Sequence, residues 1–208
     1  MPEKLLIGID LDNTLACYDH LFYRTGLEEG LINEKTPANK EQIRNSIRLL
    51  PNGEQIWTRL QAMVYGPRMC QATLFAGAAD FLKSCATNQL RALIVSHKTP
   101  TARLDGKEVD LRASAIAWLR QGGFFSELGV RPDDVFFETT RAKKIERIIT
   151  LGCTHFIDDL PEVFAVKSFP KEIQKFLFTP HSPPGVQSVL ADVHPCRSWA
   201  EIHSLFFP

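Results

Sequence analysis

Acidic side chains follow two apolar runs of this sequence, at the points where buried strands would end. Asp10 and Asp12 come at the end of the run LLIGI, and Asp158 and Asp159 follow the run THFI. Two carboxylates about 4 Å apart repel by roughly 1 kcal/mol in water and about 4 kcal/mol at the effective dielectric near a protein surface. Four carboxylates therefore need a counter-charge to stay ionised together. A divalent cation with oxygen ligands supplies it, and Mg²⁺ suits such a site.

Other polar residues accompany this acidic set. Ser96 and His97 follow the apolar run LRALIV, and Lys143 and Lys144 open a predicted helix before the run THFI. A lone aspartate at a strand end is often only a helix N-cap, but three strand ends that deliver polar groups together favour a site. The five cysteines are scattered without a CxxC spacing, and no His or Cys cluster indicates zinc.

The elements that position these residues are predicted by an alternation of β-type apolar runs with helical periodicity. It indicates an α/β fold, a doubly wound parallel sheet with helices on both faces, whose ligands bind outside the carboxyl ends of the strands. The predicted strands are Leu5–Ile9, Leu90–Val95, Asp134–Glu138, Thr154–Ile157 and Lys175–Phe178.

Three helices of this core carry apolar faces or end signals. One begins at about Leu111, one ends at the C-cap Gly152, and one follows the N-cap Ser198. The residues expected to face inward are Leu111, Ala115, Trp118 and Leu119 in the first helix, Ile145, Ile148 and Ile149 in the second, and Trp199, Ile202 and Phe206 in the third. The segment KTPTARLDGKEVDLR is interpreted as a long solvated loop.

The interval between Leu15 and the run LFAGAADFLKSC is far longer than the usual strand-to-helix loop of about 2 to 6 residues. Helical patterns at Lys40–Leu50 and Glu54–Val64, separated by PNG, predict a small helical cap inserted after the first strand. The predicted domains are therefore a core of residues 1–16 and 73–208 and a cap of residues 17–72. We expect the cap to lie over the carboxyl edge of the sheet.

Composition limits the partners. The chain of 208 residues carries 24 Lys plus Arg and 24 Asp plus Glu, so it has no basic surface typical of nucleic-acid or membrane binding. The N-terminus lacks the pattern of a signal peptide, and no apolar stretch is long enough to span a membrane. We expect a cytoplasmic protein that binds neither nucleic acid nor membrane; its oligomeric state is not predicted.

Four segments carry a family resemblance, in chain order and each after a strand or at a helix start. They are DLDNTL, VSH, the Lys143/Lys144 pair and FIDDLPEVF. Together they resemble the four motifs of the haloacid dehalogenase-like (HAD) superfamily. Most of its members have a Rossmann-like core and are Mg²⁺-dependent phosphohydrolases that pass through a phosphoaspartate. The resemblance covers the core and does not extend to the insertion.

The resemblance implies a role for each motif residue. Asp10 would be the nucleophile and a Mg²⁺ ligand, which suits an aspartate because it is ordinarily ionised at neutral pH and needs no activating base. Asp12 would protonate the leaving group, deprotonate the hydrolytic water and bind Mg²⁺ through its backbone carbonyl. Family members that displace halide need no such acid, so the presence of Asp12 favours hydrolysis of phosphate esters over dehalogenation.

The other motif residues would bind the phosphate group or the cation. Ser96 and a lysine would stabilise the transferring phosphoryl group, and Lys144 is favoured over Lys143 because it directly precedes the inward-facing Ile145. Asp159 would bind Mg²⁺ directly and Asp158 through water, or the reverse. The residues expected to contact the phosphate group are Leu11, Asn13, Thr14, Ser96, His97 and Lys143.

The function that follows is hydrolysis of a small phosphorylated metabolite, such as a sugar phosphate or a nucleotide-like compound. A phosphotransferase or phosphomutase of the same family, which passes the phosphoryl group to a second hydroxyl instead of water, fits the same motifs. A protein phosphatase and a catalytically retired binding module are also compatible with them, because a fold alone does not guarantee an activity.

Overall fold

The computed structural model describes residues 5–181 and 192–208, and the chain forms two compact units. The core unit comprises residues 1–16, 74–98 and 123–208, and the insertion unit comprises residues 17–73 and 99–122.

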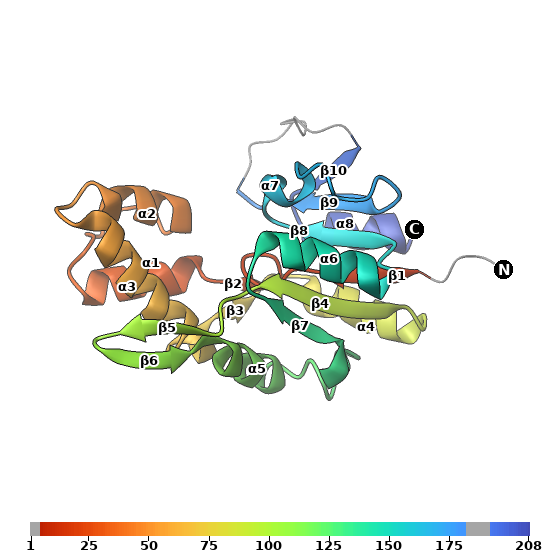
Figure 1. Cartoon of the computed structure of the whole chain (residues 1–208), viewed down its shortest axis with the longest axis horizontal. Coiled ribbons are helices and arrows are strands. Elements are labelled where there is room, and N and C mark those ends of the chain that lie inside the picture. The colour runs from red at the N-terminus through yellow and green to blue at the C-terminus, as the bar shows by residue number, and fades with distance from the viewer. Residues whose placement is uncertain (1–4, 182–191) are drawn as a thin grey trace. The chain divides into compact units, whose positions relative to one another are not determined.

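A six-stranded parallel sheet forms the centre of the core unit, in the order β10-β9-β8-β1-β4-β7 (Figure 1). Its strands are β1 Leu6–Ile9, β4 Arg91–His97, β7 Val135–Glu138, β8 His155–Asp158, β9 Gln174–Phe178 and β10 Val193–Cys196. The five predicted strands are confirmed, and β10 is a sixth that was not predicted. Ile9 pairs with Ile94 on one side and with Ile157 on the other, so the residues after β1 emerge beside the ends of β4 and β8.

Helices cover both faces of this sheet, as predicted (Figure 1). On one face lie α6 (Arg141–Leu151) and α7 (Pro161–Phe164), which share a buried apolar cluster with Leu93 and Val95 of β4. Because successive side chains of a strand point to opposite faces, β4 also has side chains on the other face of the sheet. The other face is covered by α4 (Ala78–Thr87) and α8 (Trp199–Phe206), joined by the rings of Phe81 and Trp199.

Two predicted helix ends are confirmed by their geometry. Gly152 ends α6 with a left-handed backbone, at a φ of 72°, which glycine adopts without a Cβ penalty. The hydroxyl of Ser198 accepts a hydrogen bond from the backbone N–H of Glu201 at the start of α8. One inward face was predicted wrongly, because Ile149 is 47% exposed whereas Ile145 and Ile148 are buried.

The insertion unit contains mainly helices. They are α1 Asp19–Glu28, α2 Lys40–Arg48, α3 Gly53–Tyr65, the short 3₁₀ helix η1 Met69–Gln71 and α5 Leu111–Gln121. The break predicted at PNG is confirmed, since Asn52 adopts a left-handed backbone directly before α3. The inward face predicted for α5 is buried. A two-stranded ladder of β2 (Ala16–Cys17) and β3 (Thr73–Leu74) lies where the chain enters and leaves residues 17–73.

The segment interpreted as a solvated loop is instead a β-hairpin, so that prediction was wrong. Strands β5 (Thr101–Leu104) and β6 (Lys107–Asp110) pair antiparallel through the two-residue turn Asp105–Gly106, where both residues have positive φ. Such a turn matches the natural twist of a hairpin. Arg59 of α3 forms ion pairs with Asp105 and Glu29, which attaches the hairpin to the helices of the insertion unit.

The observed units differ from the predicted domains in residues 99–122. These residues belong to the insertion unit, in which the indole N–H of Trp118 donates to the carbonyl of Ala72 at 2.9 Å. A second piece of chain, distant in sequence, thus completes the unit that sequence periodicity located only in residues 17–72. Within the described residues, no helix combines the length and apolar character needed to cross a membrane.

Gly8, in the middle of β1, allows a close approach between the sheet and the ring of Phe156. A Cβ atom at Gly8 would lie 2.5 Å from Phe156 Cδ2 and 3.0 Å from the Sγ of Cys153. The same Phe156 ring lies 5.4 Å from the ammonium group of Lys144. The glycine therefore supports the position of Lys144, a predicted site residue.

We predict that Gly8→Ala lowers the free energy of unfolding by about 1–3 kcal/mol, because the new methyl group displaces a buried ring. Phe156→Leu removes the ring, so the same Gly8→Ala change should cost less in that background. Urea unfolding of the wild type, both single variants and the double variant measures this coupling. Equal costs in the two backgrounds would show that Phe156 is not the obstacle.

Candidate active site

A buried lysine joins the ends of two strands. The Nζ of Lys144 lies 2.5 Å from Asp10 Oδ1 and 2.6 Å from Asp158 Oδ2, and all three residues are almost completely buried. Lys144 is in the first turn of α6, whose start is fixed by the Thr140 hydroxyl accepting from the backbone N–H of Lys143. The side chain of Lys143 is exposed. Of the two predicted lysines, Lys144 is therefore the one that contacts the acidic residues.

Three carboxylates gather at this edge of the core unit. One carboxylate oxygen from each of Asp10, Asp158 and Asp159 lies within 4.8 Å of the others. Asp158 accepts a hydrogen bond from the backbone N–H of Leu160 at 3.0 Å in addition to its pair with Lys144. Asp159, which is partly exposed, accepts from the Thr14 hydroxyl at 3.3 Å. Both oxygens of Asp158 are thus engaged by protein donors, whereas Asp159 faces a more open environment.

Asp12 lies apart from this group and pairs with a second buried lysine. The Nζ of Lys98 is 2.8 Å from Asp12 Oδ2 and 3.1 Å from Oδ1, and the Lys98 side chain is 3% exposed. Lys98 directly follows β4, two residues after Ser96. No site role was predicted for Lys98, although it follows the same strand as Ser96 and His97.

The two other residues predicted at the end of β4 differ in their surroundings. Ser96 is buried, and its hydroxyl oxygen has no hydrogen-bond partner among the described residues. A buried polar atom without a partner is uncommon in folded proteins, so this hydroxyl is suited to a ligand. His97 is exposed, and its Nε2 lies 3.1 Å from the carbonyl of Thr139. The histidine therefore holds the chain after β7.

The turn after β1 is closed by its own backbone. The carbonyl of Leu11 accepts hydrogen bonds from the N–H groups of Leu15 and Ala16, and the N–H of Asn13 donates to the carbonyl of Ala16. Asn13 has a φ of 63°, a left-handed conformation that asparagine tolerates well. The Thr14 carbonyl accepts from the indole N–H of Trp199. Leu11, Asn13 and Thr14 thus shape the loop that carries Asp10 and Asp12.

Burial dominates the protonation of Asp10. Loss of solvation raises the pKa of its carboxyl group from 3.8 to about 7; the Lys144 ammonium opposes this rise, and repulsion from Asp158 and Asp12 adds to it. Without a bound cation Asp10 is therefore about half protonated near neutral pH, although an aspartate is ordinarily ionised there. Burial lowers the pKa of the Lys144 ammonium group, but its contacts with Asp10 and Asp158 outweigh this and hold the pKa above its ordinary value, so the lysine stays charged.

The charges at this edge fit a divalent cation. Four carboxylates, those of Asp10, Asp12, Asp158 and Asp159, and two ammonium groups leave two negative charges unbalanced among these six groups when all are ionised. The ligand atoms of the close acidic group are all carboxylate oxygens. Mg²⁺ prefers oxygen ligands, whereas zinc is commonly bound by histidine nitrogen and cysteine sulfur.

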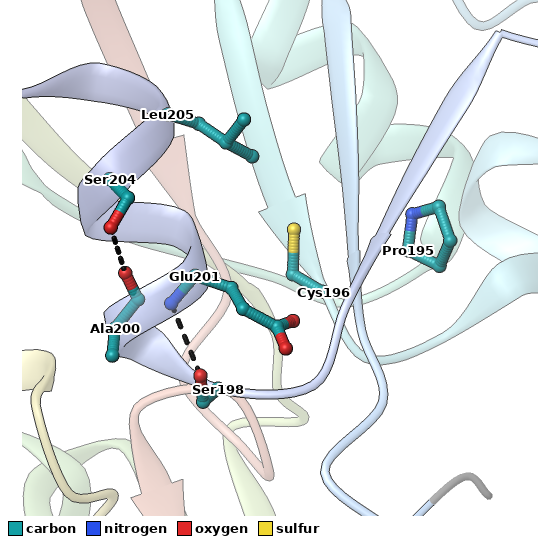
Figure 2. Close-up of a pocket in the computed structure, with 7 residues that line it drawn as sticks. All are labelled: Pro195, Cys196, Ser198, Ala200, Glu201, Ser204 and Leu205. Atoms are coloured by element: carbon teal, nitrogen blue, oxygen red, sulfur yellow. Dashed lines mark hydrogen bonds between the residues drawn. The ribbon is translucent and has the colours of Figure 1, made fainter. Parts of the chain in front are cut away.

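A surface pocket of about 520 Å³ lies elsewhere on the core unit, beside β10 and α8 (Figure 2). Its polar residues serve the helix: the Ser198 hydroxyl accepts from the N–H of Glu201, and the Ser204 hydroxyl donates to the carbonyl of Ala200. None of the predicted site residues lines it. This pocket is therefore separate from the acidic residues at the strand ends.

No protein-family model matches the sequence, and no curated protein matches it. Solved structures do match: a haloacid dehalogenase-like family hydrolase from Streptococcus pneumoniae is 18% identical with a TM-score of 0.60, covering 99% of this chain and 100% of that one. A HAD-superfamily hydrolase from Ehrlichia chaffeensis is 14% identical with a TM-score of 0.56, covering 99% and 97%.

A third structure, of the HAD-hydrolase YfnB from Bacillus subtilis bound to magnesium, is 14% identical with a TM-score of 0.55 and covers 99% of this chain and 100% of that chain. Likeness at these identities shows a shared fold. The fold class expected from the sequence is therefore confirmed.

The raised pKa of Asp10 predicts a pH dependence of stability in the absence of divalent cations. The pKa of the Asp10 carboxyl group rises on folding from its ordinary value of 3.8 to about 7. Its contribution to stability is therefore fully present at pH values below 3.8 and is lost as the pH rises towards 7. The loss amounts to up to about 4 kcal/mol. Asp10→Asn removes it, so the difference in unfolding free energy between wild type and Asp10→Asn should fall between pH 4 and 7.

Urea unfolding in EDTA across this pH range measures the difference. The exposed Asp133 provides a matched control, because Asp133→Asn should leave the pH profile of the wild type unchanged. A difference between wild type and Asp10→Asn that is constant with pH would contradict the assignment.

Proposed function

We propose that this chain, which has the haloacid dehalogenase-like fold, is a Mg²⁺-dependent phosphohydrolase that cleaves a small phosphorylated metabolite through a phosphoaspartate on Asp10. The observation that carries the proposal is the contact of the Lys144 ammonium with both Asp10 and Asp158. The buried hydroxyl of Ser96, which has no hydrogen-bond partner among the described residues, lies near the end of β4, the strand that pairs with β1. A nucleophile, a fixed positive charge and a hydrogen-bond donor thus belong to one buried edge. These are the groups that phosphoryl transfer requires.

The cation would be held by Asp10, Asp159 and the backbone carbonyl of Asp12, with Asp158 contributing through water. Asp158 is fully buried with both oxygens accepting protein hydrogen bonds, and Asp159 is partly exposed, which favours Asp159 as the direct ligand. When bound, Mg²⁺ would supply positive charge to the phosphoryl oxygens and to the surrounding carboxylates. Among the similar structures, one is described with magnesium and another, from Deinococcus radiodurans, with phosphate and sodium, which supports this choice of ligands.

In the first step a carboxylate oxygen of Asp10 attacks phosphorus, and the bond from phosphorus to the ester oxygen breaks. For this step Asp12 must first take up a proton from solvent; it gives that proton to the ester oxygen, so the alcohol leaves neutral and Asp10 carries the phosphoryl group as an acyl phosphate. In the second step water attacks phosphorus and loses a proton to Asp12, while the bond from phosphorus to Asp10 breaks. Inorganic phosphate is released, and both aspartates return to their starting states.

Lys144 and Ser96 stabilise charge during both steps. Lys144 would hold the Asp10 carboxylate in place and neutralise the charge that develops on the transferring group, while Ser96 would donate a hydrogen bond to a phosphoryl oxygen. Because these donors are buried and fixed before the substrate arrives, they need little reorganisation during the reaction. The preference for small substrates rests on the insertion unit acting as a cap, as its length and position in the sequence predict.

Phosphate release from a panel of phosphorylated metabolites with Mg²⁺ tests the proposal. We predict turnover that EDTA abolishes and excess Mg²⁺ restores, and that Asp10→Asn eliminates because no nucleophile remains. Asp133→Asn is the matched control and should keep full activity. Activity of Asp10→Asn would remove Asp10 from its role, and transfer to an added alcohol without phosphate release would indicate a phosphotransferase.

The two neighbouring lysines provide a second prediction. Lys144→Met should lower kcat by about 10²- to 10³-fold, because a fixed charge beside the nucleophile is lost. Lys143→Met should change kcat less than threefold, since its side chain is exposed. Because Lys144→Met also leaves Asp10 and Asp158 without their counter-charge, circular dichroism must establish the folded fraction of each variant. Equal losses in the two variants would contradict the assignment.

A further inference from the structure

Lys98 is a buried charged residue that has no role in the two reaction steps described above. Its ammonium group contacts both carboxylate oxygens of Asp12, at 2.8 and 3.1 Å, although the two residues are 86 positions apart in the sequence. Its backbone N–H donates to the carbonyl of Glu138 at 2.9 Å, so the main chain of Lys98 is fixed to the end of β7. The lysine is therefore anchored at both ends.

Holding a buried lysine in one geometry has a free-energy cost. A lysine side chain loses much conformational freedom when it is held in one geometry, and its ammonium group loses solvation when it is buried. A contact with both oxygens of one carboxylate also fixes the orientation of that carboxylate. The partner so held is the residue to which the proposed function assigns both proton transfers.

The position of Asp12 agrees with this view. The close group of carboxylate oxygens contains Asp10, Asp158 and Asp159, and among the described residues the Asp12 carboxylate is not part of it. Lys98 thus holds the carboxylate of Asp12 beside the acidic group but separate from it. A carboxylate kept in this way is oriented by the protein itself.

We propose that Lys98 is a positioning residue that acts through Asp12, holding its carboxylate where it transfers protons to the leaving oxygen and from the hydrolytic water. This inference rests on the proposed function. It predicts that loss of Lys98 affects the chemical steps, and affects them most when the leaving group is poor, because a good leaving group departs without a proton. Substrate binding and the cation site should change little.

The test compares p-nitrophenyl phosphate, which has a good leaving group, with phenyl phosphate, which has a poorer one. Release of each phenol is measured in single turnover with enzyme in excess, so that the first step is observed alone. In Lys98→Met the ratio of the two rates should widen at least tenfold relative to wild type, while KM for each substrate changes less than threefold. Lys98→Arg should recover part of the loss, because a guanidinium group can also contact both carboxylate oxygens.

Two comparisons separate positioning from a general structural effect. Lys175, on β9, is also buried and lies over the ring of Phe169, so Lys175→Met removes a comparable buried charge away from the site and should leave the rate ratio unchanged. In an Asp12→Asn background, adding Lys98→Met should have little further effect, since residues that act as one unit are not additive. The Mg²⁺-induced rise in melting temperature should be the same in Lys98→Met and wild type.

The outcomes distinguish the two proposals. An unchanged rate ratio in Lys98→Met, with wild-type turnover that requires Asp10, would overturn the role of Lys98 and leave the proposed function standing. Full additivity with Asp12→Asn, or an equally widened ratio in Lys175→Met, would also overturn it. A wild-type protein that releases no phosphate from any substrate would overturn both proposals.

Discussion

The placement of one ammonium group between two buried carboxylates is the constraint on which the rest of the core depends. Lys144 must start a helix whose first turn lies over the ends of β1 and β8, so that its Nζ meets Asp10 and Asp158. The ring of Phe156 lies beside this ammonium group because Gly8 has no Cβ. Burying three charges is weak evidence for stability, since their desolvation offsets much of their attraction. Such a buried charged group is a candidate functional site, which agrees with the proposed function.

A second pair, Lys98 with Asp12, obeys the same physics but divides the site into two parts. Asp10 and Asp158 both contact Lys144, and together with Asp159 they form the close acidic group. This part of the site suits a cation and a transferring phosphoryl group. Asp12 has a lysine of its own. Two carboxylates separated by only one residue thus receive different environments, which is how neighbouring acids of the same type can perform different tasks.

How much the sequence could predict depended on whether the signal was local. The apolar runs of buried parallel strands are continuous, so five of the six were recognisable; β10 was not, because Val193–Cys196 includes His194 and Pro195, which an edge strand tolerates. Ile149 was assigned to the inner face of its helix, but adjacent helical residues point about 100° apart, and Ile148 already occupies that face. The turn Asp105–Gly106 carried a recognisable hairpin signal that a polar context obscured.

The candidate site was predictable where a motif or a helical register located the residue, as for Asp10 and for Lys144 beside the buried Ile145. Lys98 carried no such signal, because a pairing across 86 positions depends on the backbone turn after β1 and on the end of β4. Its omission changes the electrostatic argument. Counting aspartates in the sequence suggests four negative charges that need compensation, whereas the two buried lysines leave two. Among these six groups, a single divalent cation would balance that remainder, which agrees with the one cation of the proposed function.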